Sequence, residues 1–201
     1  MGSNPSSRSD LPLFPLSTVL YPGGLIQLRI FEQRYLDMVR ECARHDSPFG
    51  VCLILEGHEA GDPAVPAAVG TLAQISDFFS TGEGLLAITA RGGQRFRVQH
   101  VHMRDNGQLR GDAQCWEDEP ELEVPPEFGL LPGILERLIE QVAPHLQDVP
   151  RQHYDNASWV GFRMAELLPL DGSERQMLLE TRDPLGRLAQ LRDLLPRFQR
   201  E

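Results

Sequence analysis

The apolar residues of this 201-residue chain change their spacing at about residue 117. Before this point they form short runs and alternations that are typical of β-strands, and after residue 127 they recur every three or four residues, as in amphipathic helices. The segment between is acidic and contains three prolines, which favours a linker. The sequence therefore predicts an α+β protein with a β-rich part over 11–116, a linker over 117–127 and a helical bundle over 128–201.

Turn residues divide the first part into short strands. Pro22-Gly23-Gly24, Thr81-Gly82-Glu83-Gly84 and Asn106-Gly107 are typical turn sequences. The run 49–55 is apolar throughout, which is typical of a strand buried on both faces. The predicted strands cover 11–14, 25–30, 49–55, 69–79, 84–90, 95–104 and 109–116.

One helix is predicted within this first part. Phe31, Tyr35, Met38, Val39 and Cys42 recur at spacings of three and four, so we expect Phe31 and Tyr35 to anchor the helix to the sheet. Short strands with a single helix favour a small barrel or a strongly curved sheet with the helix lying against it.

The second part is predicted to contain three or four helices. Apolar stripes indicate helices over 126–145 and 156–168. Ser173 and Gln176 have the spacing of a capping box, and Asp183-Pro184 is typical of a helix start. The leucine stripe that follows predicts the last helix of a small bundle.

The N-terminus and the cysteines indicate the compartment. Residues 1–10 are polar, so we expect a disordered leader and no signal peptide. Three cysteines at wide spacings form no disulfide pattern, and Cys42 and Cys52 fall among apolar residues, as core residues do. No stretch is long and apolar enough for a membrane span. These features predict a cytoplasmic protein.

All 19 basic side chains are arginine, and the chain contains no lysine. Arginine cannot supply the titrating amine of Schiff-base chemistry or of a Ser–Lys dyad, and a phosphate loop of the G-x-x-x-x-G-K-[ST] type also needs lysine. The net charge of −10 argues against general nucleic-acid binding. It is uneven, with a balance of −2 over residues 1–116 and −8 over 117–201.

The segment 95–104 is the best candidate for a chemically active strand. A β-bulge near Gln99-His100 would place four apolar residues inward and five polar ones together on the outer face. The apolar residues are Phe96, Val98, Val101 and Met103, and the polar ones are Arg95, Arg97, His100, His102 and Arg104.

Two alternative functions follow from that outer face. His100 and His102 could hold a metal in a hydrolase, with Asp105 or Asp112 as a further ligand, but neither spacing is diagnostic. Arg95, Arg97 and Arg104 could bind an anion or RNA. The interpretation we favour is a solvated polar face, so no metal or cofactor is expected.

Several blocks of the sequence resemble the N-terminal domain of Lon proteases in type and in order. The resemblance extends from about residue 11 to residue 195. The blocks are LPLFPL at 11–16, VLYPG at 19–23, LRIFEQRY at 28–35, VGTLAQI at 69–75, GQRFRV at 93–98 and AELLPL at 165–170.

This resemblance implies a PUA-like β pseudo-barrel followed by a helical bundle, and a function by contact with protein segments. A full Lon protease continues into an ATPase module and a Ser–Lys peptidase. Both catalytic centres depend on lysine, so we expect a stand-alone, non-catalytic module that recognises protein segments in proteolysis or quality control.

Exposed apolar residues would form the binding surface of such a module. Phe78 and Phe79 are adjacent in a strand, so alternation must turn one of them outward. Trp116, beside the acidic segment, is a second candidate, although burial would suit all three residues equally. The expected partners are other proteins or unfolded polypeptide segments and not nucleic acid or membrane, and the sequence predicts no particular oligomeric state.

Overall fold

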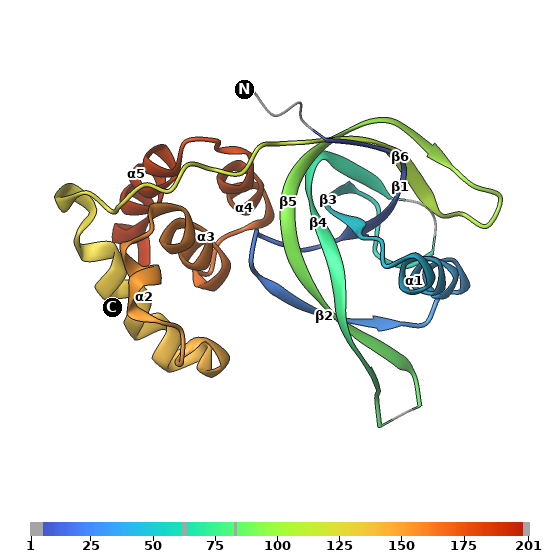
Figure 1. The fold of residues 1–201 in the computed structure, drawn as a ribbon, viewed down its shortest axis with the longest axis horizontal. Helices are drawn as coiled ribbons and strands as arrows, with labels where there is room; N and C mark the ends of the chain where they lie inside the picture. The colour runs from blue at the N-terminus through green and yellow to red at the C-terminus, as the bar shows by residue number, and fades with distance from the viewer. Residues whose placement is uncertain (1–5, 62–63, 83, 199–201) are drawn as a thin grey trace. The chain divides into compact units, whose positions relative to one another are not determined.

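The computed structural model describes residues 6–61, 64–82 and 84–198 of the chain (Figure 1). The chain divides between Asp118 and Glu119 into two compact units. The first unit contains the six strands and helix α1 (Gln33–His45), and the second contains helices α2 to α5. This organisation confirms the predicted α+β class. Among the described residues, no helix combines the length and the apolar character that crossing a membrane requires.

The strands of the first unit form one sheet that closes on itself. Their order is β2-β5-β4-β3-β1-β6, and β6 pairs with β5 as well as with β1. The pairing of β1 with β3 is parallel, and the other described pairings are antiparallel. The strands are β1 (Ser7–Leu16), β2 (Leu25–Ile30), β3 (Phe49–Glu56), β4 (Val65–Ser80), β5 (Leu86–Met103) and β6 (Leu109–Cys115).

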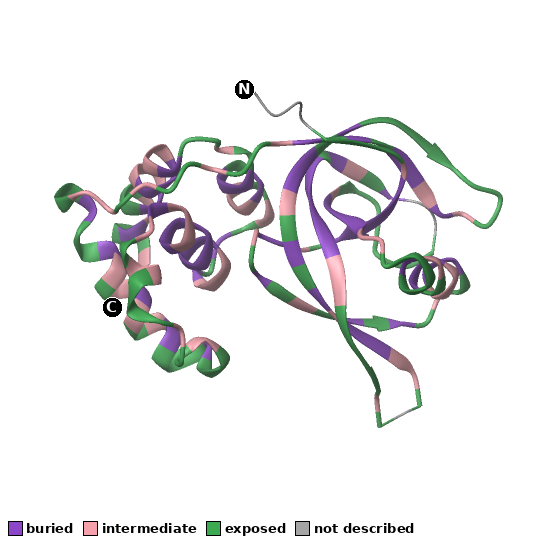
Figure 2. Ribbon diagram, viewed as in Figure 1, coloured by how far each residue is buried: buried purple, intermediate pink, exposed green. Residues whose placement is uncertain are grey.

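Strand β3 is buried on both faces over residues 49–53 (Figure 2), but the predicted apolar run 49–55 ends with a half-buried Ile54 and an exposed Leu55. Phe49 and Val51 belong to one apolar cluster together with residues of α1. Cys52, on the opposite face, belongs to a second cluster with Leu13 of β1 and Phe96 of β5. The first unit therefore has two small cores, one on each side of β1 and β3.

Helix α1 packs against the first of these cores. The ring of Tyr35 stacks on Phe14 of β1, with centroids 4.0 Å apart and planes 13° apart. Its predicted anchoring role is confirmed. Phe31 is a correction, because the helix begins at Gln33 with Glu32 as N-cap, and Phe31 lies outside the helix with 61% of its surface exposed.

Strand β1 begins earlier than the sequence predicts. The expected disordered leader extends to Asp10, but Ser7 and Arg8 pair with Gln114 and Ala113 of β6. Polar residues can pair through their backbone without burying side chains, so composition does not reveal such a strand. Residues 1–5 of the expected leader lie outside the described residues.

The helices of the second unit follow the predicted order with different ends. The predicted box of Ser173 and Gln176 is wrong, since Asp171 and Glu174 form the capping box of α4. Asp183-Pro184 opens α5 as predicted, and the Asp183 carboxylate accepts two backbone N–H groups. The helices are α2 (Leu130–Val142), α3 (Ala157–Leu167), α4 (Gly172–Glu180) and α5 (Pro184–Leu194), with 3₁₀ turns η1 (Pro126–Phe128), η2 (Pro144–Leu146), η3 (Arg151–Asp155) and η4 (Leu195–Phe198).

The acidic segment after residue 118 runs along the second unit. The carbonyl of Leu122 accepts a hydrogen bond from Ala157 N–H at 2.8 Å, and Val124 N–H donates to Asp155 at 2.8 Å. Both carboxylate oxygens of Glu119 accept hydrogen bonds from Arg187 of α5 in a bidentate ion pair. The Arg187 side chain is fully buried. The latter part of the expected linker is therefore ordered against the helices.

Candidate functional site

The β4–β5 hairpin carries the best candidate surface for binding protein segments. In Figure 1 its turn lies at the far end of β4 and β5, beyond the end of β2. Thr81 closes the turn, since its N–H donates to Leu85 and its carbonyl accepts from Gly84, both at 2.9 Å. The φ of Gly84 is 79°, a left-handed value that favours glycine. The predicted turn at 81–84 is thus present around Glu83, which lies outside the described residues.

Both candidate aromatic residues of this hairpin are exposed. Phe78 pairs with Ile88 and Phe79 with Ala87, so the two rings point to opposite faces of the sheet. Exposure is 49% for Phe78 and 37% for Phe79. Alternation requires only one of them to be exposed. Phe78 is exposed as well, although its partner Ile88 is fully buried in the core that faces α1.

Phe31, which is 61% exposed, is a third exposed aromatic residue near the hairpin, and sequence reasoning missed it. Ile30 of β2 and Ser80 of β4 both pair with Leu86 of β5. Ile30 and Ser80 are therefore two strand spacings apart, at about 10 Å, and Phe31 and Phe79 are their neighbours in the chain. We call Phe31, Phe78 and Phe79 the hairpin patch, which includes both faces of the hairpin because Phe78 and Phe79 point in opposite directions. No capping signal in the sequence could have placed Phe31 outside the helix, because Glu32, the N-cap of α1, makes no side-chain capping hydrogen bond.

Trp116, the third apolar candidate, stacks on an arginine. The guanidinium carbon of Arg95 lies 4.9 Å from the centroid of the Trp116 ring, and Trp116 N–H donates to the Arg95 carbonyl at 2.8 Å. Arg95 is only 5% exposed and Trp116 is half-buried. The prediction that Arg95 lies on an open outer face is therefore wrong, because Trp116 covers it.

The other two candidate anion-binding arginines do not join Arg95 on one surface. Arg97 is exposed between β4 and β6, where it pairs with Val69 and Gln114. Arg104 forms an ion pair with Asp10 of β1. With one arginine buried and another neutralised, no geometric observation favours the RNA alternative.

The predicted bulge near Gln99-His100 is present, but the predicted inward residues beyond it are wrong. The register shifts between Gln99 and His102, and the φ of His100 is 50°. Beyond this point β5 pairs with β6 and no longer with β4, so it loses its neighbour on one side. Val101 and Met103 are consequently 43% and 56% exposed.

The two histidines of the metal hypothesis contact different carboxylates. His100 lies 3.5 Å from Asp112, whereas His102 lies 3.2 Å from Asp10. Within the described ranges, no group of three or more His, Cys, Asp or Glu side chains has a geometry that could hold a metal ion. The site residues proposed for a hydrolase are therefore not brought together.

The three cysteines are buried and unpaired. Burial raises the pKa of Cys42 to about 11 and that of Cys52 to about 12, so both thiols are protonated at neutral pH. The predicted role of Cys42 and Cys52 as core residues is confirmed.

A charged network ties the start of the sheet to α1. Arg110 of β6 makes two hydrogen bonds to Glu41, at 2.8 and 2.9 Å, and lies 2.9 Å from Asp10. The hydrogen bonds from Arg110 hold the pKa of Glu41 below its ordinary value, although partial burial raises it. Burial raises the pKa of Asp10 too, but Arg104, Arg110 and His102 outweigh it and lower that pKa.

This network predicts an acid-sensitive contribution to stability. Because the folded-state pKa values of Glu41 and Asp10 are lowered, their contribution is complete above about pH 5 and is lost as the pH falls through the folded-state values. Glu41→Gln should therefore lower the urea midpoint at pH 7 and make its fall between pH 7 and 3.5 shallower. Glu56→Gln, at an exposed position of β3, is the control. The same pH dependence in Glu41→Gln and the wild type would contradict this role.

Comparisons with known proteins agree with the fold. The sequence model of the family described as the ATP-dependent protease La (LON) substrate-binding domain matches residues 10–197. The Lon N-terminal domain protein from Xanthomonas campestris has a crystal structure that is 46% identical, with a TM-score of 0.77, over 94% of this chain and 98% of that chain. The N-terminal domain of a Mycobacterium avium complex Lon protease shares the fold at 19% identity, with a TM-score of 0.63, over 94% and 97% of the two chains.

Complete Lon proteases are more distant and much longer. Lon protease 2 of Myxococcus xanthus is 26% identical and Lon protease of Anaeromyxobacter dehalogenans (strain 2CP-C) is 23% identical, each over 93% of this chain. The chain spans 23% of the length of these relatives. The family match covers nearly all of the chain and agrees with the resemblance found in its sequence blocks. The chain therefore belongs to the family of Lon N-terminal substrate-binding domains.

Proposed function

We propose that this chain recognises exposed apolar segments of other proteins through the hairpin patch formed by Phe31, Phe78 and Phe79. The observation that carries the proposal is the exposure of both Phe78 and Phe79 on a hairpin of a domain whose family is described by substrate binding. Unfolded or partly folded proteins present the apolar side chains that such a surface would cover.

The wider proposal is a non-catalytic recognition module that acts in proteolysis or quality control in the cytoplasm. In it the first unit is a PUA-like pseudo-barrel and the second a helical bundle. The pairing of β6 with both β1 and β5 supports the barrel, and the contacts of α3 with α2, α4 and α5 support the bundle. The proposed partners are protein segments, whether the chain acts by itself or within a longer protein.

The energetics favour an apolar partner of modest affinity. Covering the exposed part of each phenylalanine would contribute about 2 kcal/mol per ring, at roughly 25 cal/mol for each Å² of apolar surface. The entropy lost when the partner becomes ordered offsets part of this binding free energy, so a flexible segment should bind weakly by itself. This suits recognition of many sequences that share only apolar character.

A double substitution tests the patch. Phe78→Ser with Phe79→Ser should weaken binding of a permanently unfolded, dye-labelled, reduced and carboxymethylated protein by about tenfold or more. Fluorescence anisotropy gives the affinity, and circular dichroism checks that the fold persists. Leu55→Ser is the matched control, because Leu55 is 59% exposed near the opposite end of β4. Unchanged binding by the double variant would rule out the hairpin patch as the binding surface.

A further inference from the structure

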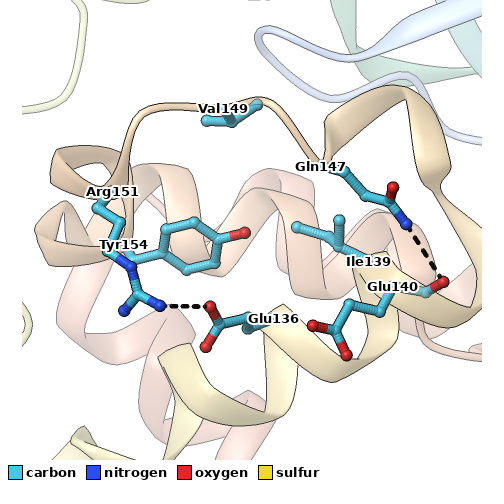
Figure 3. A pocket seen from close by; sticks show the side chains of 7 residues that line it. All are labelled: Glu136, Ile139, Glu140, Gln147, Val149, Arg151 and Tyr154. Atoms are coloured by element: carbon cyan, nitrogen blue, oxygen red, sulfur yellow. Dashed lines mark hydrogen bonds and ion pairs between the residues drawn. The ribbon is translucent and has the colours of Figure 1, made fainter.

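The second unit contains an open pocket of about 430 Å³ between α2 and the segment that leads into α3 (Figure 3). Pockets of this size hold small molecules or one or two side chains of a bound polypeptide. Helix α2 contributes one wall and residues 147–154 contribute the other. The lining residues are Glu136, Ile139, Glu140, Gln147, Val149, Arg151 and Tyr154.

The pocket has a few apolar groups at its base and two carboxylates at its rim. Ile139 is 1% exposed, and the ring of Tyr154 stands between it and Arg151 in Figure 3. Glu136 and Glu140 are four residues apart on α2, which places their carboxylates on the same face of the helix at the mouth of the pocket. A ligand would therefore contact hydrocarbon along its length and carboxylate at its end.

One of the two carboxylates already holds a cation from the chain itself. Arg151 donates to Glu136 at 2.9 Å, and 88% of the Arg151 side chain is exposed. Glu140 has no ion-pair partner within the part of the chain that the structure describes. Two carboxylates and one guanidinium leave the rim with a net negative charge.

The pKa of Tyr154 is in accord with this charge. Burial raises the pKa of its hydroxyl most, and the negative charge of Glu136 raises it further; Arg151 opposes this, and Glu140 adds the smallest increase. The field inside the pocket therefore disfavours an added negative charge.

We propose that this pocket binds a basic side chain, lysine or arginine, of an unstructured polypeptide. Such side chains combine an aliphatic stem, which would lie against Val149 and the Tyr154 ring, with a cationic end that would meet Glu140. The Arg151–Glu136 pair is an internal example of the same contact. This inference rests on the proposed function, since it names basic residues as part of what the chain recognises.

Paired peptides test the pocket directly. One unstructured, dye-labelled peptide carries phenylalanines and a central lysine, and its partner carries norleucine, which has a hydrocarbon stem but no charge, at the same position. We expect the lysine peptide to bind about fivefold more tightly in fluorescence anisotropy. Glu140→Gln should remove most of this difference, whereas Glu127→Gln, an exposed glutamate in η1 before α2, should preserve it. Arg151→Gln should increase the difference, because it frees Glu136.

The absence of lysine from the chain makes a second measurement unusually clean. A water-soluble carbodiimide joins carboxylates to amines, and no lysine side chain of the protein competes with the peptide lysine. Mass spectrometry should place the resulting amide on Glu140 or Glu136. Coupling that favours Glu127, or is spread over the acidic residues generally, would overturn the proposal.

The outcomes separate this inference from the proposed function. Equal binding of the two peptides, with loss of binding in the Phe78/Phe79 variant, would overturn the pocket and leave the hairpin patch. If the lysine peptide binds more tightly in a way that depends on Glu140, and the Phe78/Phe79 variant binds as the wild type does, the pocket is supported and the hairpin patch is overturned. If neither peptide binds the wild type, both proposals fail.

Discussion

Replacing Arg187 with methionine should lower the free energy of unfolding of the helical unit by about 3–5 kcal/mol, because a buried charge loses its partner. Arg187 is fully buried and its guanidinium lies 3.8 Å from the centroid of the Phe162 ring. It donates to the carbonyls of Leu178 and Thr181 and to both oxygens of Glu119. Methionine preserves most of the aliphatic stem but leaves these acceptors unsatisfied, so the loss is electrostatic.

Urea denaturation followed by Trp159 fluorescence measures this effect, with Trp116→Phe removing the signal of the other unit. Asp193→Ala is the control on the same helix, since the Asp193 side chain is 71% exposed and should change stability by less than about 0.5 kcal/mol. Changing Arg187 and Glu119 together to methionine should cost less than Arg187→Met, because no buried charge remains. A midpoint for Arg187→Met equal to that of Asp193→Ala would show that the pair contributes nothing.

Arg187 also shows where sequence reasoning about the helices stops. The leucine stripe and Asp183-Pro184 predict α5, because spacing and capping are local properties. Nothing local indicates that an arginine on this helix is buried, since its partner Glu119 lies 68 residues earlier in a segment predicted to be a linker. Burial of a charge depends on a long-range pair, and a single sequence does not reveal such pairs.

The capping box of α4 illustrates a different limit. Asp171 with Glu174 and Ser173 with Gln176 both have the required spacing, so the pattern alone allows two helix starts. The structure uses the first, in which Glu174 also accepts hydrogen bonds from Arg197. The presence of helix α4 was therefore predictable from the sequence. Its first residue was not, because that boundary goes with the contact between Glu174 and Arg197, 23 residues later.

The candidate site was predictable in its residues but not in its surroundings. Strand alternation requires Phe78 and Phe79 to face opposite sides, and both rings are exposed although β2 still pairs with β5 at this level. The same alternation places Arg95 outward, and there it fails because Trp116 covers the side chain. Periodicity predicts direction along a strand, whereas exposure depends on which other elements pack nearby.

The close approach of β3 and β4 leads to the second large expected effect. Gly70→Ala should lower the free energy of unfolding of the first unit by about 3 kcal/mol. A Cβ at Gly70 would lie 2.3 Å from the carbonyl oxygen of Val51, 2.8 Å from Cys52 Sγ and 2.9 Å from the Phe96 ring. A side chain can rotate away from such a contact, but the Val51 carbonyl belongs to the strand backbone. Relief therefore requires the two strands to separate.

Gly82→Ala is the matched control on the following turn, because a Cβ there has no atom within 4 Å. Trp116 fluorescence in a Trp159→Phe background reports unfolding of the first unit in urea. Gly82→Ala should stay within about 0.5 kcal/mol of the parent. Phe96→Leu, added to Gly70→Ala, should recover little stability, since the clash with the backbone of β3 remains. Full recovery would instead mean that the Phe96 ring, and not the strand spacing, requires glycine at this position.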